Sequence, residues 1–191
     1  MATIPDTEPG CCPADAPQTL GEFLAALDEH SGRIPLDELR IRLSNLKISV
    51  AEIHRHARFG SDRYQRNLLH AGPAYQALIL CWRSGQRSPI HDHTGSSCGV
   101  KVLLGTATET IFDRTPLGHI FATGSGRLTV NGVCATQDSD IHQVSNLESG
   151  DLITLHVYSP PLLCMNTYSL TDTTIAAFHD PVMTCFDGDG I

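Results

Sequence analysis

The chain has 191 residues, of which 41% are hydrophobic and 18% are charged, enough apolar material for one domain with a sizeable core. Its formal net charge is −8 and it has no basic run to neutralise phosphates, which argues against a nucleic-acid partner and against an anionic membrane surface. No apolar stretch is long enough to span a bilayer, and residues 1–17 lack the apolar segment of a secretory signal. We therefore expect a cytoplasmic protein with no nucleic-acid or membrane partner.

Seven cysteines are scattered along the chain, and no two of them form a Cys-x-x-Cys pair. The odd number and the missing signal segment favour free thiols in a reducing compartment. The absent pair argues against a structural zinc site. Cys81 and Cys134 lie in strand or turn contexts and are expected to pack as small apolar residues.

The first part of the chain carries helix signals behind a flexible arm over residues 1–17. Thr19 with Glu22, and Ser49 with Glu52, match the capping box that opens a helix. The expected helices are one after Thr19, one opened by Pro35, and one over residues 53–59 that Gly60 ends. These segments predict a small helical N-terminal cap.

Short strands separated by turn residues follow Asp62. The expected strands are 63–69, 75–82, 90–93, 98–104, 107–112, 128–130, 143–144, 152–159 and 164–169. Asn131-Gly132 is typical of a tight hairpin. The pattern predicts a mainly β, antiparallel, jelly-roll-like barrel behind the cap. We expect one domain over residues 18–191, with the cap at 18–61 and the barrel at 62–191.

Two histidines, His91 and His93, stand one residue apart in an apolar, strand-like context. Side chains at i and i+2 of a strand share a face, so both can reach one metal ion while Asp92 points away. His142 lies in a second strand-like segment. Three imidazoles without a carboxylate indicate a transition metal, either iron with open positions for O₂ or zinc that activates water.

The remaining histidines are interpreted differently. His54 and His56 also form a His-x-His pair, but they fall on an expected helix, where i and i+2 point to different sides. The other four have no partner at ligand spacing and are expected to be ordinary polar residues: His30, His70, His119 and His179.

The histidine segments resemble the two motifs of the cupin barrel family. The first motif reads here as Gly85, His91, His93, Cys98 and Gly105, with cysteine in the place of the glutamate ligand. The second is represented by His142 and Asn146, without its upstream Pro-x-Gly. The resemblance implies a cupin fold whose metal has three histidine ligands and three open positions.

Four further segments, in consistent order over about residues 63–170, resemble cysteine dioxygenase, a thiol dioxygenase of the cupin superfamily. They are Tyr64-Gln65-Arg66-Asn67-Leu68, Ala77-Leu78-Ile79-Leu80-Cys81-Trp82, Ser88-Pro89-Ile90-His91-Asp92-His93-Thr94 followed by Cys98, and Leu155-His156-Val157-Tyr158-Ser159-Pro160-Pro161. Together these segments are far more specific than the His-x-His pair alone.

The resemblance implies a role for each matching residue. His91, His93 and His142 would hold Fe(II). Arg66 would bind the substrate carboxylate, and Tyr64, at position i−2, would line the same pocket. Tyr158 would place its hydroxyl near the iron, oriented by Thr154 and His156 on the same strand face. Arginine suits this role because its planar guanidinium matches a carboxylate in two-pronged fashion.

Family members with cysteine at this position can join its sulfur to the active-site tyrosine, which implies a Cys98–Tyr158 thioether formed during turnover. The resemblance also implies a cis Ser159-Pro160 bond. Cys164 lies close to another cysteine of the family, but its register is not fixed.

The function implied is Fe(II)-dependent addition of both atoms of O₂ to the sulfur of L-cysteine, giving cysteine sulfinate, by a monomer whose partners are only the thiol and O₂. Two alternatives stay open. The substrate could be another carboxylated thiol, 3-mercaptopropionate or mercaptosuccinate. The chain could instead be a cupin that only binds metal and a small ligand, or a zinc hydrolase or isomerase.

Overall fold

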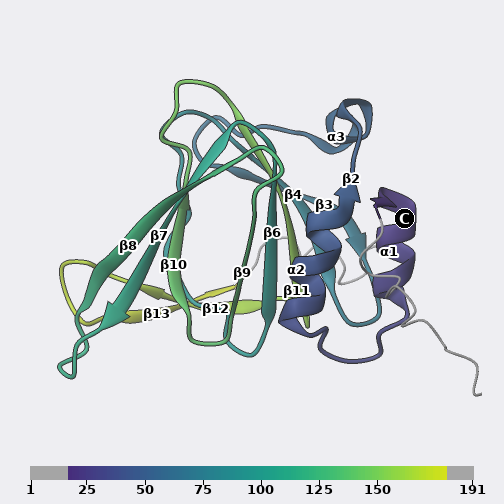
Figure 1. The fold of residues 1–191 in the computed structure, drawn as a ribbon. Helices are drawn as coiled ribbons and strands as arrows, with labels where there is room; N and C mark the ends of the chain where they lie inside the picture. The colour runs from purple at the N-terminus through teal and green to yellow at the C-terminus, as the bar shows by residue number, and fades with distance from the viewer. Residues whose placement is uncertain (1–16, 180–191) are drawn as a thin grey trace, which may run out of the picture.

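The computed structural model describes residues 17–179, which form two facing antiparallel β-sheets with a layer of helices against one of them (Figure 1). The arrangement is a mainly β, antiparallel, jelly-roll-like fold behind a helical cap, as the sequence predicted. The expected N-terminal arm lies outside the described residues except for Pro17. None of the helices within 17–179 is long and apolar enough to cross a membrane.

The helical cap consists of three short helices and a two-residue parallel strand pair. The helices are α1 (Leu20–Asp28), α2 (Leu36–Asn45) and α3 (Val50–His56); the paired strands are β1 (Gln18–Thr19) and β2 (Leu46–Lys47). Both predicted capping boxes are present, at Thr19 and Ser49. The prediction that Gly60 ends the third helix is wrong, because the backbone becomes extended at Ala57.

The sheet under the helices has five strands in the order β3-β4-β11-β6-β9. Its strands are β3 (Gln65–Ala71), β4 (Gln76–Trp82), β6 (Ser97–Leu104), β9 (Val133–Gln137) and β11 (Leu152–Ser159). The strand expected over 63–69 therefore begins two residues later, and β9 was not predicted.

The opposite sheet has six strands in the order β13-β12-β5-β10-β7-β8. Its strands are β5 (Ile90–His91), β7 (Thr106–Arg114), β8 (Ile120–Thr129), β10 (Ile141–Ser145), β12 (Cys164–Tyr168) and β13 (Ile175–His179). β8 is much longer than the expected strand at 128–130, and β13 was not predicted. Gly and small polar residues interrupt the apolar alternation that would have revealed β8.

The hairpin expected at Asn131-Gly132 is wrong, although the turn itself is present. The amide of Gly132 donates to the carbonyl of Thr129, and Asn131 has a φ of 69°, as a tight turn requires. The strands on either side, β8 and β9, belong to different sheets. The turn therefore carries the chain from one wall of the barrel to the other.

Strands β4 and β11 are buried along their whole length because the helices cover one face of their sheet and the barrel interior covers the other. Ala77, Ile79 and Cys81 face the helices, whereas Leu78 and Leu80 face the barrel interior. This explains the continuous apolar run of β4. The interior face is the one that carries the candidate site.

Helix α2 approaches the outer face of β6 very closely. A Cβ added at Gly99 would lie 2.5 Å from Cδ1 of Leu43, which is fully buried. Two residues on, the buried Lys101 donates from Nζ to the carbonyl of Leu43 at 2.8 Å, satisfying a carbonyl in the last turn of α2. Both contacts fix the helix on the sheet.

We expect Gly99→Ala to lower the free energy of unfolding by about 1–3 kcal/mol, the usual cost of overpacking a filled core. The measurement is urea unfolding followed by the fluorescence of Trp82, the single tryptophan of the chain. Gly124→Ala is the control, because nothing lies within 4 Å of a Cβ added there. Equal stability of the two variants would contradict the close approach of α2.

The segment between α1 and α2 is tied to the barrel by Arg33. Its guanidinium contacts both carboxylate oxygens of Asp138, at 2.7 and 3.1 Å, and its Nε donates to Oγ of Ser97 at 2.9 Å. The carbonyl of Asp138 in turn accepts the amide of His93 at 2.9 Å. The cap is thus linked to the histidine segment.

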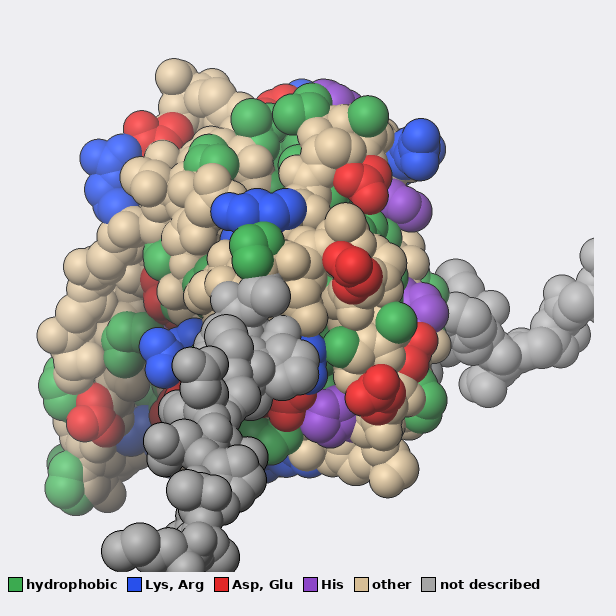
Figure 2. All heavy atoms as spheres, turned by 45° about the vertical axis from the view of Figure 1, so that its right-hand side comes forward, with side chains coloured by type: hydrophobic (Ala, Val, Ile, Leu, Met, Phe, Trp, Pro, Cys, Tyr) green, Lys and Arg blue, Asp and Glu red, His purple; other side chains and the backbone are tan. Residues whose placement is uncertain are grey.

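The surface agrees with the acidic composition. On the helical side of the molecule, acidic side chains are interspersed with single basic ones, and no broad basic area is visible on this face (Figure 2).

Candidate metal centre and active site

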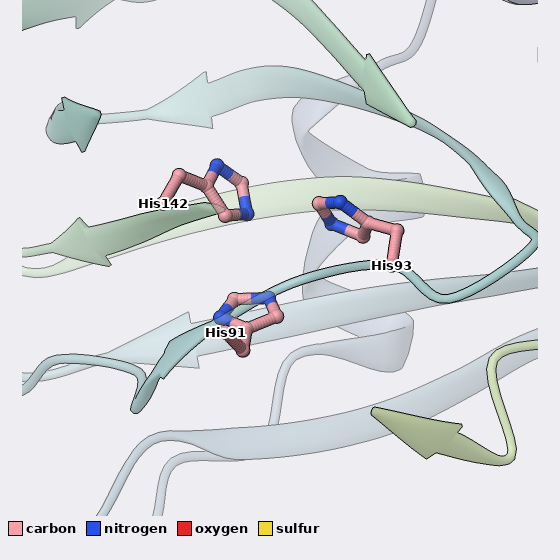
Figure 3. Close-up of side chains that lie close together, drawn as sticks. All are labelled: His91, His93 and His142. Atoms are coloured by element: carbon pink, nitrogen blue, oxygen red, sulfur yellow. The ribbon is translucent and has the colours of Figure 1, made fainter. Parts of the chain in front are cut away.

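The three histidines singled out by the sequence come together inside the barrel, with their rings facing one another (Figure 3). Their candidate ligand nitrogens all lie within 4.8 Å of one another, and all three side chains are buried. His91 ends β5 and pairs directly with His142 on β10. His93 follows just after β5, so the expected strand at 90–93 is shorter than predicted, yet the two rings still converge.

Hydrogen bonds orient two of the rings. Nδ1 of His91 lies 3.0 Å from the carbonyl oxygen of Pro89, and Nδ1 of His142 lies 2.7 Å from a carboxylate oxygen of Glu109. Each partner accepts a hydrogen bond from Nδ1–H, which leaves Nε2 as the lone-pair nitrogen. Such hydrogen bonds fix the tautomer of histidines that bind metals.

Nε2 of His93 is buried and has no hydrogen-bond partner among residues 17–179. An orphaned buried nitrogen is costly unless a ligand satisfies it. Burial, and next the neighbouring His142, lowers the pKa of His91 to about 3, and the same causes place the pKa of His93 well below its usual value. Two imidazoles held neutral at neutral pH, with lone pairs turned inward, fit a transition metal.

Asp92, between the two histidines, points away from the cluster, as expected. Its carboxylate accepts hydrogen bonds from Oγ1 of Thr94 at 2.6 Å, Nδ2 of Asn166 at 2.8 Å and the hydroxyl of Tyr168 at 2.7 Å. Burial would raise its pKa, but these hydrogen bonds hold the pKa below the usual value. The side chain therefore anchors the histidine segment to β12.

A line of hydrogen bonds runs along β11 on the inner face. Nε1 of Trp82 donates to Oγ1 of Thr154 at 2.9 Å, which lies 2.9 Å from Nε2 of His156. Nδ1 of His156 lies 3.1 Å from the hydroxyl of Tyr158. The ring of Tyr158 is 6.2 Å from that of His93, so the line ends beside the histidine cluster.

Cys98 lies directly opposite Tyr158 in the pairing of β6 with β11. Directly opposite residues share a face, with Cβ atoms about 4.5–5.5 Å apart. Burial raises the pKa of the Cys98 thiol, and hydrogen bonds with Thr136 and Tyr158 offset only part of this effect. The thiol is therefore protonated at neutral pH.

Arg66 is on β3 and its guanidinium carbon lies 5.6 Å from the centre of the Tyr158 ring. The predicted position of Tyr64 on the same strand is wrong, because β3 begins at Gln65. Tyr64 still reaches the inner core: its ring stacks on Trp82 with centroids 4.2 Å apart.

Comparison with known proteins shows the family. The family model described as cysteine dioxygenase type I matches residues 16–171. The chain belongs to this family. It is 32% identical over 160 residues to cysteine dioxygenase type 1 of Danio rerio, covering 80% of each chain. It is 33% identical over 152 residues to the Rattus norvegicus enzyme of the same name, covering 76% of each.

Among solved structures, the TT1209 protein from Thermus thermophilus has a similar fold, with a TM-score of 0.50, 16% sequence identity, and coverage of 57% of this chain and 94% of that one. This likeness concerns the fold alone. As a member of the cysteine dioxygenase family, the chain is an oxygenase enzyme.

The other histidines lie away from the cluster. His54 and His56 are on α3, while His30 contacts Glu38 and His70 contacts Asp28, both at 3.1 Å. These contacts agree with the expectation of ordinary polar residues. Within residues 17–179 all four cysteines are free thiols, and Cys164 is exposed at the start of β12.

Sequence reasoning missed two residues of this cysteine dioxygenase family site, the indole donor Trp82 and the carboxylate Glu109. Trp82 lies in one of the four family-like segments, but the sequence alone implies no role for it. Glu109 is two residues beyond the inward-facing Ala107, so strand alternation was a signal that it also faces inward. Its contact with His142 depends on how β7 pairs with β10, which local sequence does not give.

Proposed function

We propose that the chain is an Fe(II)-dependent thiol dioxygenase that adds both atoms of O₂ to the sulfur of L-cysteine, giving cysteine sulfinate. The observation that carries the proposal is the buried three-histidine cluster beside Arg66 and Tyr158, in a chain of the cysteine dioxygenase family.

His91, His93 and His142 would hold the iron through their inward nitrogens. When bound, Fe(II) would supply a site for the thiolate and for O₂. Iron is preferred to zinc because this family is named for oxygenation, a reaction in which zinc has no redox role. The reaction needs no further cofactor, because the thiolate supplies the electrons that reduce O₂.

Arg66 would bind the substrate carboxylate. Its guanidinium lies near the Tyr158 ring, so a carboxylate held there would keep the remainder of a small thiol close to the histidines. The interior face offers apolar walls from Leu78 and Leu80, where a charge-assisted hydrogen bond is strong.

Tyr158 would hold a proton beside the reacting groups. Burial lowers the pKa of His156 well below its usual value, so the imidazole is neutral, with one donor nitrogen and one acceptor nitrogen. Trp82 already donates to Thr154, whose own proton is available to Nε2 of His156. Nδ1–H then donates to the Tyr158 oxygen, which would orient the phenol beside the position where the substrate would bind.

The deciding experiment is O₂ uptake by the Fe(II)-loaded protein with L-cysteine, 3-mercaptopropionate and mercaptosuccinate in parallel, with the sulfinate quantified by mass spectrometry. One sulfinate per O₂ from L-cysteine is the expected result. Preference for another of these thiols would keep the chemistry and change the substrate. No uptake with any thiol, despite bound iron, would favour a non-oxidative metal-binding cupin.

We expect a Cys98–Tyr158 thioether to form in a fraction of molecules during turnover with O₂ as oxidant. The two residues oppose each other across β6 and β11, which supports the bond. Forming the C–S bond removes one hydrogen from the sulfur and one from the phenol ring. Intact mass after turnover should therefore fall by two hydrogen masses. The Cys98→Ala control cannot form the link, so its mass should not change on turnover. An equally unchanged mass in the wild-type protein would exclude the link.

The proposal includes a cytoplasmic monomer whose partners are the small thiol and O₂, without nucleic acid or membrane. Free thiols at all four described cysteines support a reducing compartment.

A further inference from the structure

Glu109 is a carboxylate that faces the barrel interior from β7. In the pairing of β7 with β10 it stands opposite Val144, one diagonal step from His142, which pairs with Ile111. Its Oε1 lies 2.7 Å from Nδ1 of His142, and the two side chains are only 13% and 2% exposed. The distance is typical of a strong, charge-assisted hydrogen bond.

The three histidines are therefore supported unequally. His142 donates to a carboxylate at 2.7 Å, whereas His91 donates to the backbone carbonyl of Pro89 at 3.0 Å. Within residues 17–179, Nδ1 of His93 has a weaker partner, the hydroxyl of Thr136 at 3.4 Å. A carboxylate partner increases the basicity of an imidazole more than a neutral acceptor does. The ligand strengths should decrease in the order His142, His91, His93.

Glu109 also bears on the replacement of the cupin glutamate by Cys98. That replacement removes the single carboxylate from the expected ligand set, and the remaining three imidazoles are neutral donors. Glu109 restores a negative charge to the same region of the interior from β7, the strand that pairs with β10, and it is separated from the proposed metal position by the imidazole of His142. After burial, the negative charge of Glu109 is the next cause that raises the pKa of the Cys98 and Cys134 thiols.

We propose that Glu109 is a positioning residue that acts on the metal through His142, fixing its inward nitrogen and making it the strongest donor of the three. The inference rests on the proposed metal site. It predicts that the carboxylate tightens metal binding and lowers the Fe(III)/Fe(II) reduction potential, because added negative charge favours the more oxidised ion.

The test compares Glu109→Gln with the wild-type chain in two measurements that need no thiol: Co(II) and Fe(II) affinity by chelator competition, and the reduction potential of the iron-loaded protein. Glutamine keeps the shape and a carbonyl acceptor for Nδ1–H but removes the charge. We expect metal affinity to fall about 10- to 100-fold, with a higher reduction potential. Glu148→Gln, which changes an exposed carboxylate bonded to Arg127, should alter neither.

Wild-type affinity and potential in Glu109→Gln would overturn the inference. If that variant does not fold, as judged by circular dichroism, Glu109→Asp gives the answer, because it keeps the charge but withdraws it from His142. Weaker metal binding by folded Glu109→Asp is expected, and wild-type binding would again overturn the inference. A wild-type protein that binds iron but oxidises no thiol would refute the proposed function alone, whereas one that binds no metal would refute both.

Discussion

Replacement of His93 by alanine is expected to remove the bound metal and the thiol-oxidising activity together. The Nε2 atom of His93 is buried without a hydrogen-bond partner in the described part of the chain. A bound metal would satisfy this nitrogen. Loss of the hydrogen-bond partner of a metal ligand lowers metal affinity by roughly 10- to 100-fold. Loss of the ligand itself should lower metal affinity by more than this. Iron content by elemental analysis and O₂ uptake, measured on the same sample, check this prediction.

The chain contains its own control. His54 and His56 reproduce the His-x-His spacing on helix α3, so His54→Ala changes the same kind of motif away from the cluster. This variant should keep full iron content and activity. Full iron occupancy in His93→Ala would contradict the assignment of His93 as a ligand.

Arg66→Ala is expected to raise the KM for L-cysteine strongly while iron content stays unchanged. Truncating one partner of a buried charge pair costs about 2–5 kcal/mol, which corresponds to a loss of about 30-fold or more in kcat/KM. Steady-state kinetics with iron-loaded protein measure the change, and cysteamine, which lacks the carboxylate, should react equally poorly with both proteins.

Two further variants separate charge from geometry. Arg66→Lys keeps the positive charge but loses the planar fork, so an intermediate KM is expected. Arg63→Ala removes an exposed arginine from the same segment and should leave KM unchanged. An unchanged KM in Arg66→Ala would remove the carboxylate-binding role.

The sequence predicted the histidine cluster because its signals are local. A two-residue spacing in an apolar segment identifies His91 and His93 without knowledge of any other strand, and the motif around His142 adds the third ring. Likewise the capping boxes at Thr19 and Ser49 determine helix starts through contacts within four residues.

Features that depend on strand pairing could not be predicted in this way. Asn131-Gly132 specifies a turn, but whether its flanking strands pair with each other is decided by the two sheets that receive them. Glu109 is close to His142 only through the register of β7 and β10. For Tyr64 only the strand assignment is wrong: β3 begins at Gln65, the next residue, and the Tyr64 ring still packs in the inner core through its stacking on Trp82.

The ion pair between Arg33 and Asp138 limits how far this enzyme can be truncated from its N-terminal side. Removing residues before β3 would strip the apolar cover from one side of β4 and β11, and would also release the loop whose carbonyl holds the His93 amide. A barrel truncated at that point is expected to aggregate, and the His93 side chain is expected to be held less firmly in the histidine cluster. Engineering for size should therefore start elsewhere.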